Sequence, residues 1–281
     1  MKAVIMAGGE GTRLRPLTCN LPKPMVPIVH KPMMEHILNL LKAHSIHEIA
    51  STLWYLPQDV MDYFGDGSQF GVSMEYFVEE EPLGTAGSVK NAEDFLNETF
   101  VVVSGDSLTD IDLSKAVAFH RERNAVATLV LTRVANPLNY GIVITGEDGR
   151  IRQFLEKPSW SEVFSDTVNT GIYVLEPEVL QEFAKGQNVD FSRDLFPKLL
   201  AKEAPIYGYI ADGYWSDVGN LEVYRQAQQD CLDGKVRIDL GKPQGDRIYV
   251  AEGALVAADA EITGPAYIGP GAHISSRVRV G

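Results

Sequence analysis

Short apolar runs and segments of helical period alternate along roughly the first 235 residues of the chain. Runs rich in Val, Ile, Leu and Phe predict strands, and several are apolar on both faces, as strands buried inside a sheet are. The predicted strands cover residues 2–6, 49–54, 72–77, 100–104, 127–134 and 172–175. Strands separated by helices are typical of an α/β domain with a mostly parallel, Rossmann-like mixed sheet flanked by helices.

Apolar residues at helical spacing lie between these strands. One stripe runs from Met34 to Leu41 at i, i+3, i+4 and i+7, and a second covers residues 113–123. The turn-forming run at residues 146–149, with apolar segments on both sides, predicts a hairpin that departs from the parallel sheet. A last helix is expected over residues 221–232, because Gly234 follows it as a terminating residue.

The period of the pattern changes beyond residue 247. A β-branched residue recurs every six positions, and alanine stands two positions before four of them: Val250, Val256, Ile262, Ile268, Ile274 and Val280, with Ala254, Ala260, Ala266 and Ala272. Six-residue periodicity predicts the start of a left-handed parallel β-helix of hexapeptide repeats, whereas an ordinary hairpin pair would give period two.

Three units follow from the change of period: a domain over residues 1–235, a linker over 236–247 and the β-helix over 248–281. The repeats stay in phase to Gly281 without a polar capping turn. An uncapped solenoid exposes its apolar end. We therefore expect either a longer chain that continues past Gly281 or a homo-oligomer in which another subunit covers that end.

Composition narrows the class of protein. The 25 Lys and Arg against 38 Asp and Glu give a net charge of −13, which disfavours nucleic acid as a partner. No run approaches the roughly 18 apolar residues of a membrane span, and the N-terminus lacks the apolar run of a secretory signal. We expect a cytoplasmic protein without a membrane partner. Two distant cysteines argue against a disulfide framework or a structural zinc site.

Positive charge is concentrated at the start of this acidic chain. Residues 1–31 contain five Lys or Arg and one Glu, a local charge of +4 that leaves −17 for the remainder. A glycine-rich loop, Gly8-Gly9-Glu10-Gly11-Thr12, directly follows the first predicted strand. Glycines let main-chain N–H groups approach an anion closely. The two features together favour binding of a small polyphosphate.

Two familiar phosphate-binding motifs do not fit this loop. A Walker A loop has Lys after its second glycine, where this chain has Thr12, and the dinucleotide fingerprint has glycine where Leu14 stands. Lys23 lies between Pro22 and Pro24, which restrict the backbone and pre-orient its side chain.

The segment GGEGTRLRPLTCNLPKPM resembles the signature of the sugar-1-phosphate nucleotidyltransferases. The resemblance continues in EPLGTAG, GD, YG, EKP, NTG and WSD, and covers residues 1 to about 230. Members of this family join a nucleoside triphosphate (NTP) to a sugar 1-phosphate and release pyrophosphate. The resemblance therefore implies that fold, that activity and those two substrates, and a hexapeptide-repeat tail is common in the family.

The reaction brings two anions together, so the protein must neutralise charge and align the reactants. By resemblance, Gly8, Gly9, Gly11 and Thr12 cradle the nucleotide. The resemblance also implies that Arg13 neutralises the departing β,γ-phosphates and that Lys23 bridges the phosphates that react. Asp106, which follows an apolar strand, and Asp217 would hold Mg²⁺, which prefers oxygen ligands.

The resemblance places the stretch with Gly84 and Thr85 against the base, with Glu79 reading the base edge. A carboxylate can accept from the two adjacent donors of guanine, whereas uracil or thymine offers one. GTP is therefore favoured as the nucleotide. GTAG also resembles the guanylyltransferase version of the family more than the thymidylyltransferase version, which implies guanylyl transfer to mannose 1-phosphate, and a glucose-1-phosphate thymidylyl-, uridylyl- or adenylyltransferase is the alternative. Glu79 to Glu81 can also be read as a solvated acidic run.

By resemblance, Gly141, Glu156, Lys157 and Asn169 hold the sugar hydroxyls and the sugar phosphate. Tyr140 and Trp215 are expected either as pocket walls or in the core. A non-catalytic regulatory subunit remains an alternative of another class, because fold does not imply function. Such a subunit would be expected to lack Arg13, Lys23 or Asp106, all of which are present.

Overall fold

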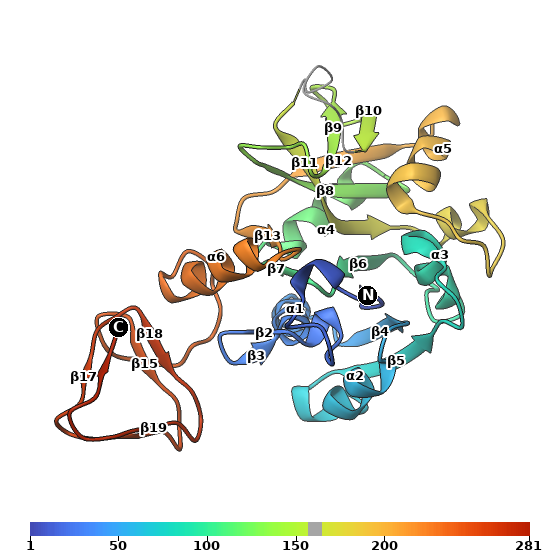
Figure 1. Cartoon of the computed structure of the whole chain (residues 1–281). Coiled ribbons are helices and arrows are strands. Elements are labelled where there is room, and N and C mark those ends of the chain that lie inside the picture. Colours follow the sequence, from blue (N-terminus) through green and yellow to red (C-terminus); the bar gives the residue numbers. More distant parts are fainter. Residues whose placement is uncertain (157–164) are drawn as a thin grey trace.

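The computed structural model describes residues 1–156 and 165–281, and of Glu156 the backbone alone. A nine-stranded mixed sheet forms the centre of the molecule (Figure 1). One half of the sheet is parallel, in the order β5–β4–β1–β6. Its strands are β1 (Lys2–Met6), β4 (Glu48–Leu53), β5 (Ser73–Val78) and β6 (Phe100–Ser104). The predicted strands in this half are confirmed to within a residue or two.

The other half of the sheet is largely antiparallel. β11 pairs antiparallel with β6, β8 and β9, while β9 and β10 form the predicted hairpin and β12 runs parallel to β8. These strands are β8 (Ala127–Arg133), β9 (Gly141–Thr145), β10 (Ile151–Glu156), β11 (Thr167–Leu175) and β12 (Ile206–Ile210). The α/β class with a mixed sheet flanked by helices is confirmed.

Helices cover both faces of the sheet because neighbouring residues of each strand point to opposite faces. Ala3 and Ile5 of β1 pack into a core with α1, α2 and α4. Val4 packs into a second core with α3, α5 and the π-helix η6. These elements are α1 (Met33–Ala43), α2 (Pro57–Phe64), α3 (Gly84–Asn91), α4 (Leu113–Glu122), η6 (Phe191–Leu195) and α5 (Phe196–Ala201), with short 3₁₀ helices η1 (Thr12–Leu14), η2 (Lys23–Met25), η3 (Ser68–Phe70) and η5 (Pro177–Glu182). None of the described helices is long and apolar enough to cross a membrane.

A third, smaller core lies outside the main sheet. It joins α6 (Leu221–Leu232) to β7 (Ser107–Thr109), β13 (Trp215–Asp217) and the pair β2 (Pro27–Ile28) and β3 (Lys31–Pro32). Val236 is buried in this core, so the chain beyond α6 still packs against the preceding elements. Both cysteines are free; Cys231 is buried in this core and Cys19 is exposed.

The last residues form three parallel ladders, which outline a triangle in Figure 1. In each ladder a residue pairs with the residue 18 positions later. The six periodic residues pair with one another: Val250 with Ile268, Val256 with Ile274 and Ile262 with Val280. The strands are β14 (Pro243–Gly245), β15 (Ile248–Val250), β16 (Leu255–Val256), β17 (Glu261–Ile262), β18 (Ala266–Ile268), β19 (His273–Ile274) and β20 (Arg279–Val280). Three six-residue periods therefore separate each pair of stacked residues.

Candidate active site

The glycine-rich loop leaves β1 and enters the 3₁₀ helix η1. Gly11 has φ +69°, and a Cβ built there would lie 2.8 Å from Cβ of Lys23. The Thr18 hydroxyl donates to the Gly11 carbonyl oxygen over 2.7 Å, which closes the loop. Glycine is needed at this position for its left-handed backbone and for the close approach of the Lys23 side chain.

Lys23 lies between two carboxylates. Its Nζ is 2.5 Å from Oδ2 of Asp106 and 3.5 Å from Oδ1 of Asp217, and its side chain is 8% exposed. Burial lowers the pKa of Lys23, but the two carboxylates outweigh it, so the pKa is raised above its ordinary value. The ammonium is therefore the cation that balances this pair of acids.

Short antiparallel pairing brings the two aspartates together. Asp106 occupies the turn between β6 and β7, and Asp217 ends β13. Strand β7 pairs with β13, and Ser107 lies directly opposite Asp217. Residues far apart in the sequence thus meet at the end of the central strand β6, where open α/β sheets bind ligands.

The aspartate pair fits a divalent cation. Burial, followed by the charge of Asp106, raises the pKa of Asp217, although Lys23 and Arg13 lower it. Two carboxylates that share one cation and repel each other are suitable ligands for Mg²⁺, which takes one or two carboxylates together with phosphate oxygens. Among the described residues, no cluster of three or more His, Cys, Asp or Glu side chains offers an alternative metal site.

Two cavities meet at Asp106. The larger, of about 510 Å³, contains Arg13, Gly141, Asn169 and Asp217, and the smaller, of about 310 Å³, contains Gly8, Gly9, Glu79 and Gly84. Thr85, Ser104 and Asp106 line both. Of the residues expected at the nucleotide, Gly8, Gly9, Glu79 and Gly84 line only the smaller cavity, and of those expected at the sugar, Gly141 and Asn169 line only the larger one. Gly11, Thr12 and Lys23 line neither of these two cavities.

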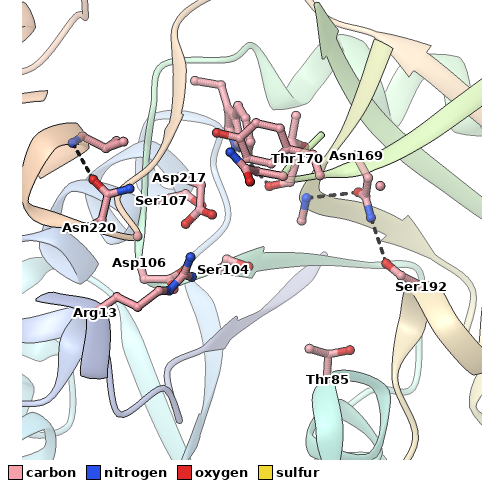
Figure 2. Close-up of a pocket in the computed structure, with 17 residues that line it drawn as sticks. Arg13, Thr85, Ser104, Asp106, Ser107, Asn169, Thr170, Ser192, Asp217 and Asn220 are labelled. Atoms are coloured by element: carbon pink, nitrogen blue, oxygen red, sulfur yellow. Dashed lines mark hydrogen bonds between the residues drawn. The ribbon is translucent and has the colours of Figure 1, made fainter. Parts of the chain in front are cut away.

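Arg13 projects toward the point where the cavities meet. Figure 2 shows its guanidinium beside Asp106, with Asp217 and Ser107 nearby. A Cβ built on Gly219 would lie 3.3 Å from a guanidinium nitrogen of Arg13, so this glycine leaves room for the side chain. Within residues 1–156 and 165–281, Arg13 forms no hydrogen bond or ion pair. Its charge is thus available for an anion in the larger cavity.

Glu79 is buried, whereas Glu80 and Glu81 are exposed. The interpretation of these residues as a solvated acidic run is therefore wrong for Glu79. Its Oε2 accepts the Leu83 N–H over 3.0 Å, and its Oε1 lies on the side of Gly8. The Leu83 bond fixes the carboxylate in the wall of the smaller cavity. A carboxylate held in this way can accept hydrogen bonds from a ligand in that cavity.

The glycine that begins α3 is required by packing. Gly84 has φ +72°, and a Cβ there would lie 2.6 Å from the Val189 carbonyl oxygen. That oxygen accepts the backbone N–H groups of Ala86 and Gly87 at 2.9 and 3.0 Å. The Thr85 hydroxyl donates to Asp190 over 2.9 Å. The GTAG residues therefore bind the 189–190 segment as well as line the cavities.

Asn169 is the best-fixed of the predicted sugar residues. Its Nδ2 donates to Tyr173 Oη and Ser192 Oγ at 2.9 and 3.3 Å, and its Oδ1 accepts the Gly171 N–H. Figure 2 shows Asn169 and Ser192 facing each other at the cavity edge. Lys157 and the side chain of Glu156 lie outside the described residues.

Tyr140 and Trp215 form one wall of the larger cavity. Their rings meet edge to face with centroids 5.3 Å apart, and the Trp215 indole donates to the Thr170 carbonyl oxygen over 3.0 Å. The expectation that Tyr140 and Trp215 are pocket walls is the one that the structure bears out.

Several lining residues carry no sequence signal that singles them out. They are the polar residues Ser107, Asn139, Asp190, Ser192 and Asn220. Ser104 was also missed but does carry a signal, because a polar residue that ends an apolar strand is a recognisable pattern at the ligand-binding edge of an open sheet.

A sequence model described as nucleotidyl transferase matches residues 2–234, so the chain belongs to the nucleotidyl transferase family. The protein is thus a nucleotidyltransferase by family and fold.

Two relatives are similar along the whole chain. A UTP–glucose-1-phosphate uridylyltransferase from Synechocystis is 40% identical over 100% of this chain and 76% of its own length. A mannose-1-phosphate guanylyltransferase from Mycobacterium tuberculosis is 38% identical over 99% of this chain and 77% of its own length. Among solved structures, a Bacillus anthracis protein proposed to be a glucose-1-phosphate thymidylyltransferase, with sucrose bound, matches with a TM-score of 0.75. It has 27% identity and covers 86% of this chain and 98% of that one.

Proposed function

We propose that the protein transfers a nucleotidyl group from an NTP to a sugar 1-phosphate, with GTP and mannose 1-phosphate as substrates and GDP-mannose and pyrophosphate as products. The observation that carries the proposal is the meeting of two cavities at Asp106, one with the glycine loop and one with Asn169. Two substrates bound in these halves would bring their phosphates to Arg13 and to Asp106, whose carboxylate is paired with the Lys23 ammonium. The presence of both cations together with Asp106 supports an enzyme rather than a regulatory subunit.

The reaction is a displacement at the α-phosphorus. An oxygen of the sugar phosphate forms the new bond to the α-phosphorus, and the bond from that phosphorus to the oxygen bridging it to the β-phosphate breaks. Pyrophosphate leaves with the electron pair. Arg13, which forms no hydrogen bond or ion pair among the described residues, stabilises the charge on the departing phosphates. The buried Lys23 stabilises charge on the phosphates that approach.

We propose that Asp106 and Asp217 hold a divalent cation, Mg²⁺. The support is the geometry of two carboxylates that share one cation, the Lys23 ammonium. When bound, the metal supplies charge neutralisation for the phosphate oxygens. The protein itself keeps the two carboxylates adjacent through the β7–β13 pairing. When no metal is bound, the Lys23 ammonium balances their charge.

Glu79 supports guanine as the base. Its carboxylate is buried in the wall of the nucleotide half and is fixed by the Leu83 N–H. Guanine offers N1–H and an amino group side by side, which suit one carboxylate. The second candidate is uridylyl transfer from UTP to glucose 1-phosphate, which is favoured by the 40% identity to the Synechocystis uridylyltransferase.

Two of the four residues predicted for the sugar are described with their side-chain positions. Asn169 and Gly141 line the larger cavity, and Glu156 and Lys157 stay predictions for the sugar hydroxyls and phosphate. We also propose that residues 248–281 are two stacked turns of a left-handed parallel β-helix, supported by ladders between residues 18 positions apart.

The test is a panel of NTPs and sugar 1-phosphates with Mg²⁺, in which pyrophosphate release and the sugar nucleotide formed are both measured. We expect release only when an NTP and a sugar 1-phosphate are present together, with the highest kcat/KM for GTP and mannose 1-phosphate. Highest kcat/KM for UTP and glucose 1-phosphate would select the second candidate. No release with any pair would reject nucleotidyl transfer to sugar phosphates.

A further inference from the structure

The carboxylate of Asp110 joins three separate segments of the chain. Asp110 directly follows β7, and its side chain is 9% exposed. Its Oδ1 accepts the Tyr214 N–H over 2.7 Å, and its Oδ2 accepts the Arg237 N–H over 2.9 Å. The Arg237 guanidinium adds bonds to Oδ2 and to the Asp110 carbonyl oxygen at 3.2 and 3.0 Å. We name this arrangement, made by Asp110, Tyr214 and Arg237, the clasp.

The clasp closes one end of the β7–β13 ladder. Tyr214 immediately precedes β13, and its carbonyl oxygen accepts from the Thr109 hydroxyl and the Asp110 N–H at 2.7 and 3.2 Å. Gly213 has φ +123°, and a Cβ there would lie 2.9 Å from Asp110 Oδ1. The chain therefore has glycine where a side chain would approach the clasp too closely.

The opposite end of the same ladder carries the two aspartates of the candidate active site. The ladder has three residue pairs, from Thr109 opposite Trp215 to Ser107 opposite Asp217, and Asp106 is the next residue. An isolated two-stranded ladder is marginally stable in water. A slip of its register would separate Asp106 from Asp217, because the pairing decides which residues are opposite each other.

Arg237 connects the clasp to the chain that follows the family match, which ends at residue 234. Its neighbour Val236 is buried in the core with α6, and Ile238 packs against the same core. The guanidinium itself is largely exposed, at 77% of the side chain. This position lets Arg237 be changed without opening a cavity in the core.

We propose that Asp110 and Arg237 are positioning residues that fix the register of β7 and β13 and thereby hold Asp106 and Asp217 at the spacing the reaction needs. The part of this proposal that concerns the reaction rests on the proposed function. The hydrogen bonds of the clasp do not depend on that function. Groups that orient metal-binding side chains typically change metal affinity or activity by about 10- to 100-fold when they are removed.

The experiment compares two clasp variants with two matched controls in the full chain. Asp110→Asn keeps one acceptor oxygen but loses the second, and Arg237→Ala removes the exposed guanidinium. Asp112→Asn is the control for the first, since Asp112 also accepts backbone N–H groups, at the N-terminus of α4, outside the clasp. Arg247→Ala is the control for the second, since Arg247 pairs with Asp233 at 2.7 Å, away from the ladder.

Two readouts are taken for each variant. Hydrogen exchange with mass spectrometry reports the opening of residues 107–109 and 215–217 in the ligand-free protein. Steady-state kinetics give kcat, both KM values and the Mg²⁺ concentration for half-maximal rate. We expect about tenfold faster exchange in both clasp variants, a fall in kcat of at least fivefold and a rise in half-saturating Mg²⁺, with both KM values within twofold. The controls should match the unmodified protein in exchange and in kcat.

Unchanged exchange in Arg237→Ala would overturn Arg237 as a positioning residue, and unchanged exchange in Asp110→Asn would overturn the clasp. Arg237→Ala keeps the backbone N–H that donates to Asp110, so it tests the guanidinium alone, and it can still be measured if Asp110→Asn fails to fold. Faster exchange with unchanged kcat and Mg²⁺ dependence would overturn the positioning role. An equal fall in kcat in the controls Asp112→Asn and Arg247→Ala would also overturn the positioning role. If the unmodified protein is inactive with every substrate pair, the proposed function fails, and the exchange data still decide whether the clasp holds the ladder.

Discussion

Replacing Lys23 with methionine removes the ammonium that lies between Asp106 and Asp217 and keeps a side-chain stem of similar length. The stem packs against Gly11, so methionine should preserve that contact. What changes is the charge: two carboxylates, 29% and 36% exposed, then face each other without their shared cation. Folding stability and activity should both fall.

The size of the stability loss follows from the burial of the three groups. Removing one partner of a fully buried ion pair costs about 3–5 kcal/mol. Lys23 is 8% exposed, but water reaches both aspartates, which weakens the repulsion that remains. We therefore expect a loss of about 2 kcal/mol in the free energy of unfolding near pH 8. We expect kcat to fall at least about 100-fold, as when a group that stabilises transition-state charge is removed.

The loss should depend on pH with a definite sign. The pKa of Lys23 is raised, so in the unmodified protein its stabilisation is complete below the ordinary lysine value of about 10.4 and persists between pH 5 and 8. The pKa of Asp217 is raised by burial and by Asp106, so its ionisation costs stability as pH rises above the ordinary aspartate value. Without Lys23 that pKa rises further. The deficit of the variant should therefore be largest at pH 8 and shrink toward pH 5, as one carboxylate binds a proton.

The assay is urea denaturation at pH 5 and pH 8, with Lys90→Met as the matched control. Lys90 is also buried and bonds Glu93 and the Leu180 carbonyl oxygen at 2.9 and 2.7 Å, but it balances no pair of carboxylates. Its variant should lose stability without the same pH dependence and should keep kcat. A deficit in Lys23→Met that is equal at both pH values, or that grows toward pH 5, would refute the shared-cation reasoning.

Three other substitutions test separate parts of the site. Arg13→Ala should lower kcat about 100-fold with the sugar phosphate KM within twofold. Urea denaturation should find its unfolding free energy unchanged within about 0.5 kcal/mol, because the Arg13 side chain forms no hydrogen bond or ion pair among the described residues. Gly84→Ala should lower unfolding free energy by about 2–4 kcal/mol in the same assay, given φ +72° and the Val189 oxygen 2.6 Å from its Cβ. Glu79→Gln keeps an acceptor for Leu83, so kcat/KM should fall about tenfold for GTP and less than twofold for UTP.

Strands β1 and β6 of the parallel half could be predicted because they are short apolar runs that are buried on both faces. The same pattern placed Asp106 at the end of β6, since Phe100–Ser104 is apolar until its last residue. The periodic residues beyond 247 pair as their spacing predicts, because a fixed period forces identical positions into register.

Other features depend on contacts that no local pattern encodes. The pairing of Asp217 with Ser107 joins segments separated by five strands of the main sheet, and the clasp uses Arg237 from the predicted linker. The tight contact between Gly84 and Val189 is likewise set by tertiary packing, although a glycine at the start of a helix suggests little more than a turn. The apolar pattern predicts elements, whereas the distances between their ends are set by how those elements pack.

The most direct test of nucleotidyl transfer follows labelled phosphorus from GTP. The protein is incubated with Mg²⁺, mannose 1-phosphate and GTP labelled at either the α- or the γ-phosphorus. Attack on the α-phosphorus predicts that the α-label appears in the sugar nucleotide and the γ-label in pyrophosphate, and that neither is released without the sugar phosphate. Appearance of the γ-label in orthophosphate or on the sugar, or retention of the α-label in GDP, would contradict the proposed reaction.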